Sequence, residues 1–238
     1  MSGHSKWANI KRKKEANDER RGKIFTKLSR LITLAVVEGG GIPDPEKNVK
    51  LRLIIEKAKA SNMPKENISR AVERATSNDA KNLKELIYEG FGVQGVSILI
   101  VCTTDNSNRS YNDVRSTLEK LGGKIGSPGS AIFNFQKCGI VIFNKTDVSE
   151  DELMQITENI EAFDIEEEEE SYVIYFPFEK LGHLEKGIGN LKQQGEVYYR
   201  PLNSIKVTQQ QSEELMHISE VLEDLDDVQK VYMNVEIQ

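Results

Sequence analysis

The apolar residues of this chain repeat at a helical period as far as about residue 75 and at a strand period beyond it. Apolar residues spaced by three or four positions form three stripes, which predict helices over residues 24–36, 51–58 and 68–75. A triple glycine would end the first helix, and Asp44-Pro45 would start the second as an N-cap followed by proline. A single change of period of this kind predicts a small helical domain followed by an α+β region.

Short apolar runs alternate with helical stripes in the rest of the chain. Between residues 139 and 199 the expected order is strand, helix, strand, strand, helix, strand, which is the split βαβ pattern of ferredoxin-like domains. Half of such a unit precedes it and another half follows it. The expected strands are 96–102, 131–135, 140–143, 163–165, 172–176, 197–199, 204–207 and 228–237, and the expected helices cover 114–121, 153–160, 181–188 and 215–222.

The two half-units are explained most simply as one domain that the complete unit interrupts, because two separate half-sheets would leave exposed edges. The predicted fold class is therefore α+β, with a small N-terminal helical domain followed by two ferredoxin-like α/β domains, the third inserted into the second. The predicted domains are residues 1–79 (basic arm and helical domain), 80–135 plus 204–238 (split domain) and 136–203 (inserted βαββαβ domain).

Charge is distributed unevenly along the chain. The net charge is -6, yet residues 1–75 hold 18 Lys and Arg against 9 Asp and Glu, a net of +9. The remaining residues hold 14 against 29, a net of -15. This asymmetry indicates a basic module for a polyanionic partner joined to an acidic body.

No apolar run is long enough to predict a membrane-spanning helix, and the N-terminus carries charges where a signal peptide has an apolar stretch. We therefore expect a cytoplasmic protein that does not contact membranes. Cys102 and Cys138 each lie inside an apolar run, so we expect two buried reduced thiols. We also expect a monomer.

Ten basic residues fall within the first thirty positions, against three acidic ones. Enough charge is present to neutralise several phosphates and release their counterions, which predicts nucleic-acid binding. Lys23, Lys27 and Arg30 follow at i, i+4 and i+7, so they form one basic stripe on the first helix. The predicted nucleic-acid-binding residues are Lys6, Trp7, Lys11, Arg12, Lys13, Lys14, Arg20, Arg21, Lys23, Lys27 and Arg30.

Trp7 is the only tryptophan, and a basic residue lies on either side of it. It is suited to stack on an exposed base or ribose. The alternative is that Trp7 docks on the core of the protein itself while the basic residues form a solvated face.

Other motifs point away from catalysis. Gly90 to Gly95 matches G-x-G-x-x-G, but it precedes a predicted strand instead of following one, so we reject a dinucleotide site and expect a glycine-rich turn. The three histidines are not at metal-ligand spacing. The acidic run Glu166 to Glu170 is explained as solvated charge, with a metal or a basic partner as the alternative. We predict no enzyme activity, no cofactor and no metal.

The segment Asp105 to Arg109 follows a predicted strand and opens a predicted helix. Such a segment either caps the helix or binds an anion, and capping is the simpler interpretation.

Several of these segments resemble the YebC family, and the likeness runs through the whole chain in the same order. The resembling motifs are G-H-S-K-W-A-N-I-K (Gly3 to Lys11), R-G-K-I-F-T-K-L (Arg21 to Leu28), G-G-G-I-P-D-P (Gly39 to Pro45), A-S-N-M-P-K-E-N-I (Ala60 to Ile68), Y-E-G-F-G (Tyr88 to Gly92) and T-D-N-S-N-R (Thr104 to Arg109). The resemblance implies a helical N-terminal domain and two ferredoxin-like domains.

The resemblance also implies a function in gene expression. The YebC family is described as probable transcriptional regulators that bind DNA, and members are also linked to translation, including a mitochondrial translational activator of cytochrome oxidase subunit one and relief of bacterial ribosomes stalled at proline runs. The basic N-terminal segment of the family falls here on Lys6, Lys11, Arg12, Lys13, Lys14, Arg21, Lys23 and Lys27.

This chain has Arg12-Lys13 where the family commonly has His-Arg, and Val93-Gln94 where it commonly has Pro-Gly. The first change keeps the positive charge, and the second alters the expected shape of a turn. The two main hypotheses are a DNA-binding transcriptional regulator and an RNA- or ribosome-binding translation factor. A scaffold that binds only protein, or an enzyme using carboxylates near Asp105 or Glu166 to Glu170, is a weaker alternative.

Overall fold

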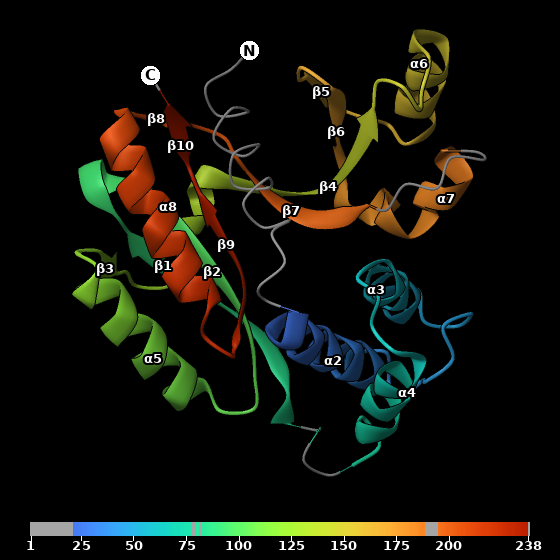
Figure 1. The fold of residues 1–238 in the computed structure, drawn as a ribbon, viewed down its shortest axis with the longest axis horizontal. Coiled ribbons are helices and arrows are strands. Elements are labelled where there is room, and N and C mark those ends of the chain that lie inside the picture. Colours follow the sequence, from blue (N-terminus) through green and yellow to red (C-terminus); the bar gives the residue numbers. More distant parts are fainter. Residues whose placement is uncertain (1–20, 78–79, 81, 189–194, 238) are drawn as a thin grey trace.

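The structure, a computed structural model, describes residues 21–77, 80, 82–188 and 195–237. It is a mixed α/β fold in which an N-terminal helical region lies beside antiparallel sheets (Figure 1). Within the described residues, no helix is both long enough and apolar enough to span a membrane.

The helical region consists of α2 (Arg21–Glu38), α3 (Val49–Ala60) and α4 (Lys65–Arg74), as predicted. The stripes meet in one core, in which Leu28, Ile32 and Leu51 are almost fully buried. The expected start of the second helix at Asp44-Pro45 is wrong. Asp44 to Lys47 form a turn, and the N-cap is Asn48, whose side chain accepts a hydrogen bond from the Leu51 amide at 3.0 Å and donates one to the Ala35 carbonyl at 2.8 Å.

The first sheet (sheet A) has the strand order β3-β1-β2-β9. Its strands are β1 (Lys84–Phe91), β2 (Ser97–Thr104), β3 (Lys124–Ile125) and β9 (Val228–Met233). β1 and β2 form a hairpin, and the glycine-rich motif supplies the end of β1 and the turn, including the short helix η3 (Val93–Gly95). Gln94 and Gly95 have positive φ there. The motif therefore joins two strands, which agrees with the rejection of a dinucleotide site.

Two helices, α5 (Ser107–Lys120) and α8 (Gln209–Glu223), contribute apolar side chains to the same core as sheet A. This core joins residues distant in the sequence, because Ile98 and Ile100 of β2 lie in one cluster with Leu118 and Leu215. β9 continues past Asn234 into β10 (Val235–Ile237), which pairs in parallel with β8 (Ile205–Val207).

The second sheet (sheet B) has the order β5-β6-β4-β7. The elements along the chain are β4 (Phe135–Asn144), α6 (Glu150–Asn159), β5 (Asp164–Glu167), β6 (Ser171–Pro177), the 3-10 helix η5 (Phe178–His183), α7 (Leu184–Gly187) and β7 (Glu196–Pro201). The predicted order of strand, helix, strand, strand, helix, strand is therefore found in this segment. Its second helix is a 3-10 turn and a single α-helical turn.

Several expectations about the strands are wrong. Neither β1 nor β3 was predicted, and the final strand is interrupted at Asn234. The strand expected at 131–135 is instead a short 3-10 helix, η4 (Ile132–Asn134), before β4 begins at Phe135. The cause is the buried carboxylate of Glu89, which accepts hydrogen bonds from the amides of Gly129, Ala131 and Ile132 at 2.6, 2.6 and 2.8 Å. These bonds hold the segment in a turn.

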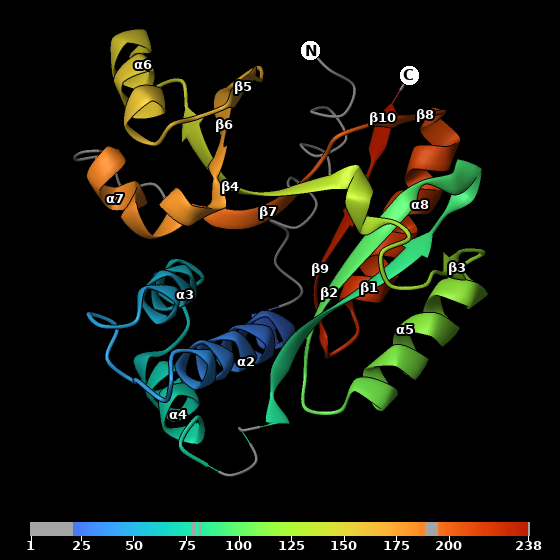
Figure 2. The same ribbon diagram turned by 180° about the vertical axis from the view of Figure 1, so that it is seen from behind.

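Sheets A and B contact each other through aromatic side chains. Tyr232 of β9 lies with its ring centroid 5.3 Å from those of Tyr198 and Tyr199 on β7, and its hydroxyl donates to the Val197 carbonyl at 3.1 Å. Seen from behind, the long β4 runs from the side of sheet A into sheet B (Figure 2). The two sheets are thereby joined by covalent continuity and by a shared apolar cluster.

Both cysteines are buried and free, as predicted. Burial raises the pKa of Cys102 to about 12 and that of Cys138 to about 11. Neither thiol is ionised near neutral pH.

Candidate nucleic-acid interface

The predicted binding residues divide into two groups. Lys6, Trp7, Lys11, Arg12, Lys13, Lys14 and Arg20 lie outside the described residues, as does the side chain of Arg21. Lys23, Lys27 and Arg30 lie on α2 and are described in full. The contacts of these three residues locate the predicted stripe within the molecule.

The basic stripe of α2 faces the end of α8. Lys27 Nζ donates to the carbonyl of Glu223 at 2.5 Å, and Lys23 Nζ donates to the carbonyl of Asp224 at 3.4 Å and lies 3.6 Å from its carboxylate. The last carbonyls of a helix lack intrahelical partners and carry the negative end of the helix dipole. The last turn of α8 contains no basic residue, so two lysines from α2 stabilise this end instead.

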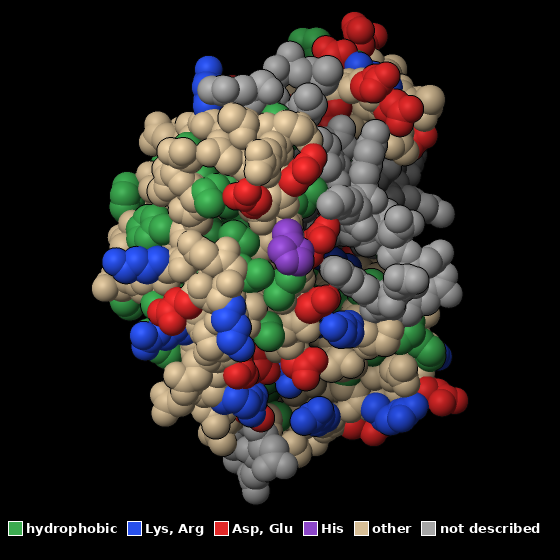
Figure 3. All heavy atoms as spheres, turned by 60° about the vertical axis from the view of Figure 1, so that its left-hand side comes forward, with side chains coloured by type: hydrophobic (Ala, Val, Ile, Leu, Met, Phe, Trp, Pro, Cys, Tyr) green, Lys and Arg blue, Asp and Glu red, His purple; other side chains and the backbone are tan. Residues whose placement is uncertain are grey.

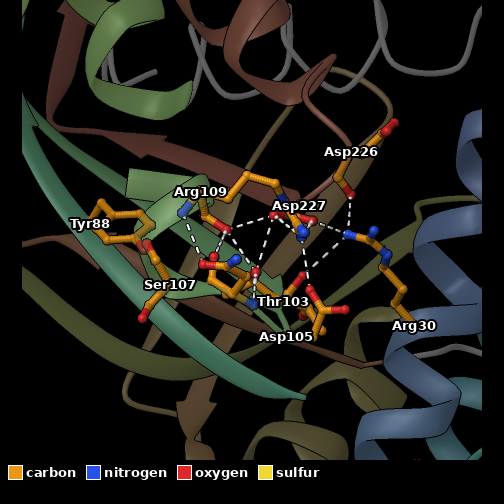
Figure 4. A network of polar contacts seen from close by, with 11 residues as sticks. Arg30, Tyr88, Thr103, Asp105, Ser107, Arg109, Asp226 and Asp227 are labelled. Atoms are coloured by element: carbon orange, nitrogen blue, oxygen red, sulfur yellow. Dashed lines mark hydrogen bonds and ion pairs between the residues drawn. The ribbon is translucent and has the colours of Figure 1, made fainter. Parts of the chain in front are cut away.

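Arg30 contacts the same loop one turn further along α2. Its guanidinium donates to the carbonyl of Asp226 at 3.0 Å and forms an ion pair with the carboxylate of Asp227 (Figure 4). Asp227 also accepts hydrogen bonds from Arg109 at 3.0 Å and from the hydroxyls of Ser110 at 2.6 Å and Thr104 at 3.1 Å. One carboxylate therefore connects α2, the end of β2, α5 and the loop before β9.

Asp227 is 7% exposed. Burial alone would raise the pKa of its carboxyl group, but hydrogen bonds from Ser110, Arg30 and Arg109 outweigh burial and lower it. The hydrogen bond to Asp227 likewise raises the pKa of Arg109. Asp227 is therefore an ionised acceptor for two arginines. We call the set of contacts from Lys23, Lys27 and Arg30 to residues 223–227 the α2 clasp.

The segment Asp105 to Arg109 is a helix cap, as predicted. The Asn106 side chain accepts a hydrogen bond from the Arg109 amide at 3.1 Å, and the Thr104 hydroxyl accepts one from the Asn106 amide at 2.9 Å. The Arg109 side chain reaches both Asp105 and Asp227. The motif thus orders the N-terminus of α5 and holds Asp227 in place.

Sequence reasoning missed Asp227 and the loop that carries it. A signal was present, because Glu223, Asp224, Asp226 and Asp227 gather at the C-terminus of a predicted helix. Acidic side chains are unfavourable there unless cations from elsewhere approach. The acidic cluster therefore predicts that basic side chains from another part of the chain lie against it, although it does not identify which ones.

Other cations of the helical region differ in whether they have partners. Lys50 pairs with Glu38 at 2.5 Å, and Lys57 pairs with Glu196 of β7 at 2.6 Å. Lys59, Lys65 and Arg74 are exposed and have no ion pair within the part of the chain that the structure describes. Lys59 and Lys65 flank the turn between α3 and α4.

On the face of α5 and α8, basic and acidic side chains are interspersed (Figure 3). A basic area for a polyanion is therefore better sought on the helical region. The acidic run is partly used inside the protein: Glu166 lies 3.4 Å from Arg200, Glu167 lies 2.6 Å from Lys145, and Glu168 is buried and accepts a hydrogen bond from Ser171 at 2.9 Å. Among the described residues, no group of three or more His, Cys, Asp or Glu is placed to hold a metal ion.

Comparison with known proteins covers the whole chain. A family model described as the TACO1/YebC protein N-terminal domain matches residues 5–78, and one described as the TACO1/YebC second and third domain matches residues 83–235. The two matches meet where the hydrophobic period changes.

Proteins named "probable transcriptional regulatory protein" are similar over nearly their full length. The one from Finegoldia magna is 41% identical, covering 98% of each chain. The one from Caldanaerobacter subterraneus subsp. tengcongensis is 42% identical, covering 100% of this chain and 99% of the relative. The crystal structure of a conserved hypothetical protein from Aquifex aeolicus superposes with a TM-score of 0.83 at 34% identity, covering 93% of this chain and 92% of that one.

Proposed function

This chain belongs to the TACO1/YebC family, and from that premise we propose that it is a non-enzymatic, nucleic-acid-binding regulator of gene expression. The observation that carries the proposal is the net charge of +9 on the first 75 residues, in a chain whose total net charge is -6. A module with this charge attracts polyanions, while the acidic body keeps the rest of the surface from binding them without specificity.

The proposed surface combines two sets of residues. The first is the predicted set from Lys6 to Arg21 in the N-terminal segment. The second is the exposed group of Lys59, Lys65 and Arg74 on α3 and α4. Phosphate contacts from such side chains position a protein on a nucleic acid without reading its sequence.

Regulation of transcription through DNA is the primary candidate, and the names of the curated relatives support it. The second candidate is an RNA- or ribosome-binding translation factor. The observation that favours it is the exposed side of α4, where Glu66 and Glu73 alternate with the cations. A helix with this mixture of charges is less suited to enter a DNA major groove between two phosphate strands.

We propose the predicted three-domain division, 1–79, 80–135 plus 204–238, and 136–203, for a monomeric cytoplasmic protein. The division is supported by the pairing of β9 with β2 across an intervening segment that forms its own sheet. The proposal includes no cofactor.

The test is binding of the full chain to duplex DNA, single-stranded RNA and intact ribosomes across a salt titration. A variant with Lys11, Arg12, Lys13 and Lys14 replaced by alanine is expected to bind less tightly and to show a shallower dependence on salt, because fewer counterions are released. A second variant replaces Lys59, Lys65 and Arg74 with glutamine. Its matched control replaces Lys120, Lys124 and Lys206, which are exposed on the α+β part, with glutamine. The control therefore also removes three positive charges.

Tight, sequence-selective duplex binding would identify a transcriptional regulator. Preference for ribosomes or RNA would identify a translation factor. The surface proposed on α3 and α4 is wrong if the variant that lacks Lys59, Lys65 and Arg74 has the same affinity as its control variant for all three polyanions. If none binds the wild type, the proposed function is wrong.

A further inference from the structure

We propose that residues 223–227 act as an internal substitute for a phosphate backbone, occupying the basic stripe of α2 until a nucleic acid displaces them. The inference rests on the proposed function and adds a regulatory step to it. The helical region would then exist in a docked form, in which the stripe is covered, and a released form, in which it is available.

The geometry of the α2 clasp carries this inference. Lys23 and Lys27 contact oxygen acceptors of Asp224 and Glu223, and Arg30, further along the helix, contacts those of Asp226 and Asp227. The acceptors are carbonyl oxygens at the negative end of α8 together with the carboxylates of Asp224 and Asp227. A phosphate backbone also presents a row of anionic oxygens to Lys and Arg side chains. The two ligands therefore require the same three side chains and exclude each other.

The two ligands also respond to the same conditions. Contacts between partly exposed charges weaken as salt rises, and the side chain of Lys23 is 52% exposed while that of Arg30 is 26% exposed. A polyanion competes for the same cations, and its binding also weakens as salt rises. The loop raises the specificity of the stripe, because only a ligand with several correctly spaced phosphates replaces all of its contacts.

The consequence for affinity follows from linkage. When the competent form is a minor fraction, the apparent dissociation constant rises by the inverse of that fraction. Replacing an acidic residue of the α2 clasp should therefore strengthen nucleic-acid binding, even though that residue is not part of the N-terminal segment. A purely structural ion pair would not produce this effect.

The experiment measures the distance between α4 and α5 in the full chain. Ser69→Cys and Asn112→Cys are exposed positions for spin labels, and the native thiols are buried and un-ionised. We expect a narrow main distance peak in the free chain, with a minor longer component from the released form. A saturating 20-nucleotide single-stranded RNA should replace the narrow peak with a broader, longer distribution, as should high salt without RNA.

Asp227→Asn tests the clasp directly. It should populate the released form without RNA and bind RNA about tenfold more tightly, as for a competent state that is otherwise populated about one-tenth of the time. Asp226→Asn is the matched control, because it removes the same charge from the neighbouring residue, whose backbone carbonyl alone contacts Arg30. If Asp227→Asn does not fold, Asp224→Asn replaces it as the test variant, because the Asp224 side chain is only half-buried, and it should give a smaller shift in the same direction.

RNA binding with an unchanged distance distribution would overturn this inference and leave the proposed function intact. Equal RNA affinity of the wild type, Asp227→Asn and Asp224→Asn would also overturn it. Failure of every form to bind RNA or DNA would overturn the proposed function and the competition together.

Discussion

The helical region contacts the rest of the chain at two places whose chemistry is opposite. At the α2 clasp, lysine and arginine side chains meet the end of α8 and the carboxylate of Asp227. At the other place, α3 packs against η5 and β7: Val49 fits over Gly182, where an added Cβ would lie 2.8 Å from a Val49 methyl, and Leu53 packs against the core of sheet B. Lys57 and Glu196 add one exposed ion pair there.

This difference in chemistry indicates which of the two contacts can be released. Apolar burial responds little to ionic strength, whereas exposed ion pairs lose strength as salt screens them and more buried pairs lose less. A polyanion can replace the partners of Lys23, Lys27 and Arg30, but it offers nothing to Leu53. The helical region is therefore attached by one contact that is sensitive to charge and one that is not.

The largest effect should come from Asp227→Asn. Two arginines, Ser110 and Thr104 would lose an ionised acceptor, and breaking a largely buried pair costs about 3 kcal/mol in the free energy of unfolding. The measurement is urea unfolding, because urea does not screen charge. We expect the loss to shrink at high salt. A loss below about 1 kcal/mol would show that the clasp contributes little to stability.

Breaking the apolar contact between α3 and sheet B should lower the free energy of unfolding by a smaller amount, and this loss should not depend on salt. Leu53→Ala is expected to cost about 2 kcal/mol, the low end for a leucine because this one is only partly buried. Met154→Ala is the matched control, since Met154 is 65% exposed on α6 and its truncation should change the unfolding free energy little. A salt-dependent effect of Leu53→Ala would contradict the assignment of this contact as apolar.

Lys27→Gln should cost about 1 kcal/mol at low salt, because it removes a cation from the negative end of α8. The same substitution at Lys59, which has no ion pair among the described residues, should leave stability unchanged. Thermal unfolding of both variants at low and high salt checks this. Equal behaviour of the two variants would mean that the contact between Lys27 and Glu223 is not stabilising.

Acid should release the clasp and spare the apolar contact. The pKa of Asp227 is lowered in the folded state, so its contribution to stability is fully present above the unfolded pKa of about 3.9 and is lost as the pH falls through the folded value. The spin-label distance between positions 69 and 112 should lengthen only below about pH 4. In Asp227→Asn this part of the acid response should be absent. A lengthening between pH 5 and 7 would implicate another group.

Local patterns predicted most of the elements. The stripes of α2, α3 and α4 have clear periods, and the segment of sheet B has apolar runs separated by turn residues, so their order followed from the sequence. The order of the strands in sheet A was harder. β1 contains Glu89 and Gly90, which interrupt the apolar pattern of a strand, although both are buried in the folded protein.

The remaining errors have one physical origin. Glu89 turns the segment at 129–132, and Asp227 gathers Arg30 and Arg109, through contacts between residues far apart in the chain. Hydrophobic period and charge counts are local properties, so they identified Lys23, Lys27 and Arg30 as a basic stripe without indicating which anion lies against it. Binding of nucleic acid by these residues stays a prediction.

The separation of Lys27 from Glu223 by 196 positions also has a consequence for protein synthesis. A ribosome adds about 5–20 residues per second, so α2 emerges roughly 10–40 seconds before its acidic partner is made. During that interval the cationic stripe of every newly made molecule is uncovered and close to the RNA of the ribosome. Every chain is therefore in the released form during its synthesis, before residues 223–227 exist and the docked form can be made.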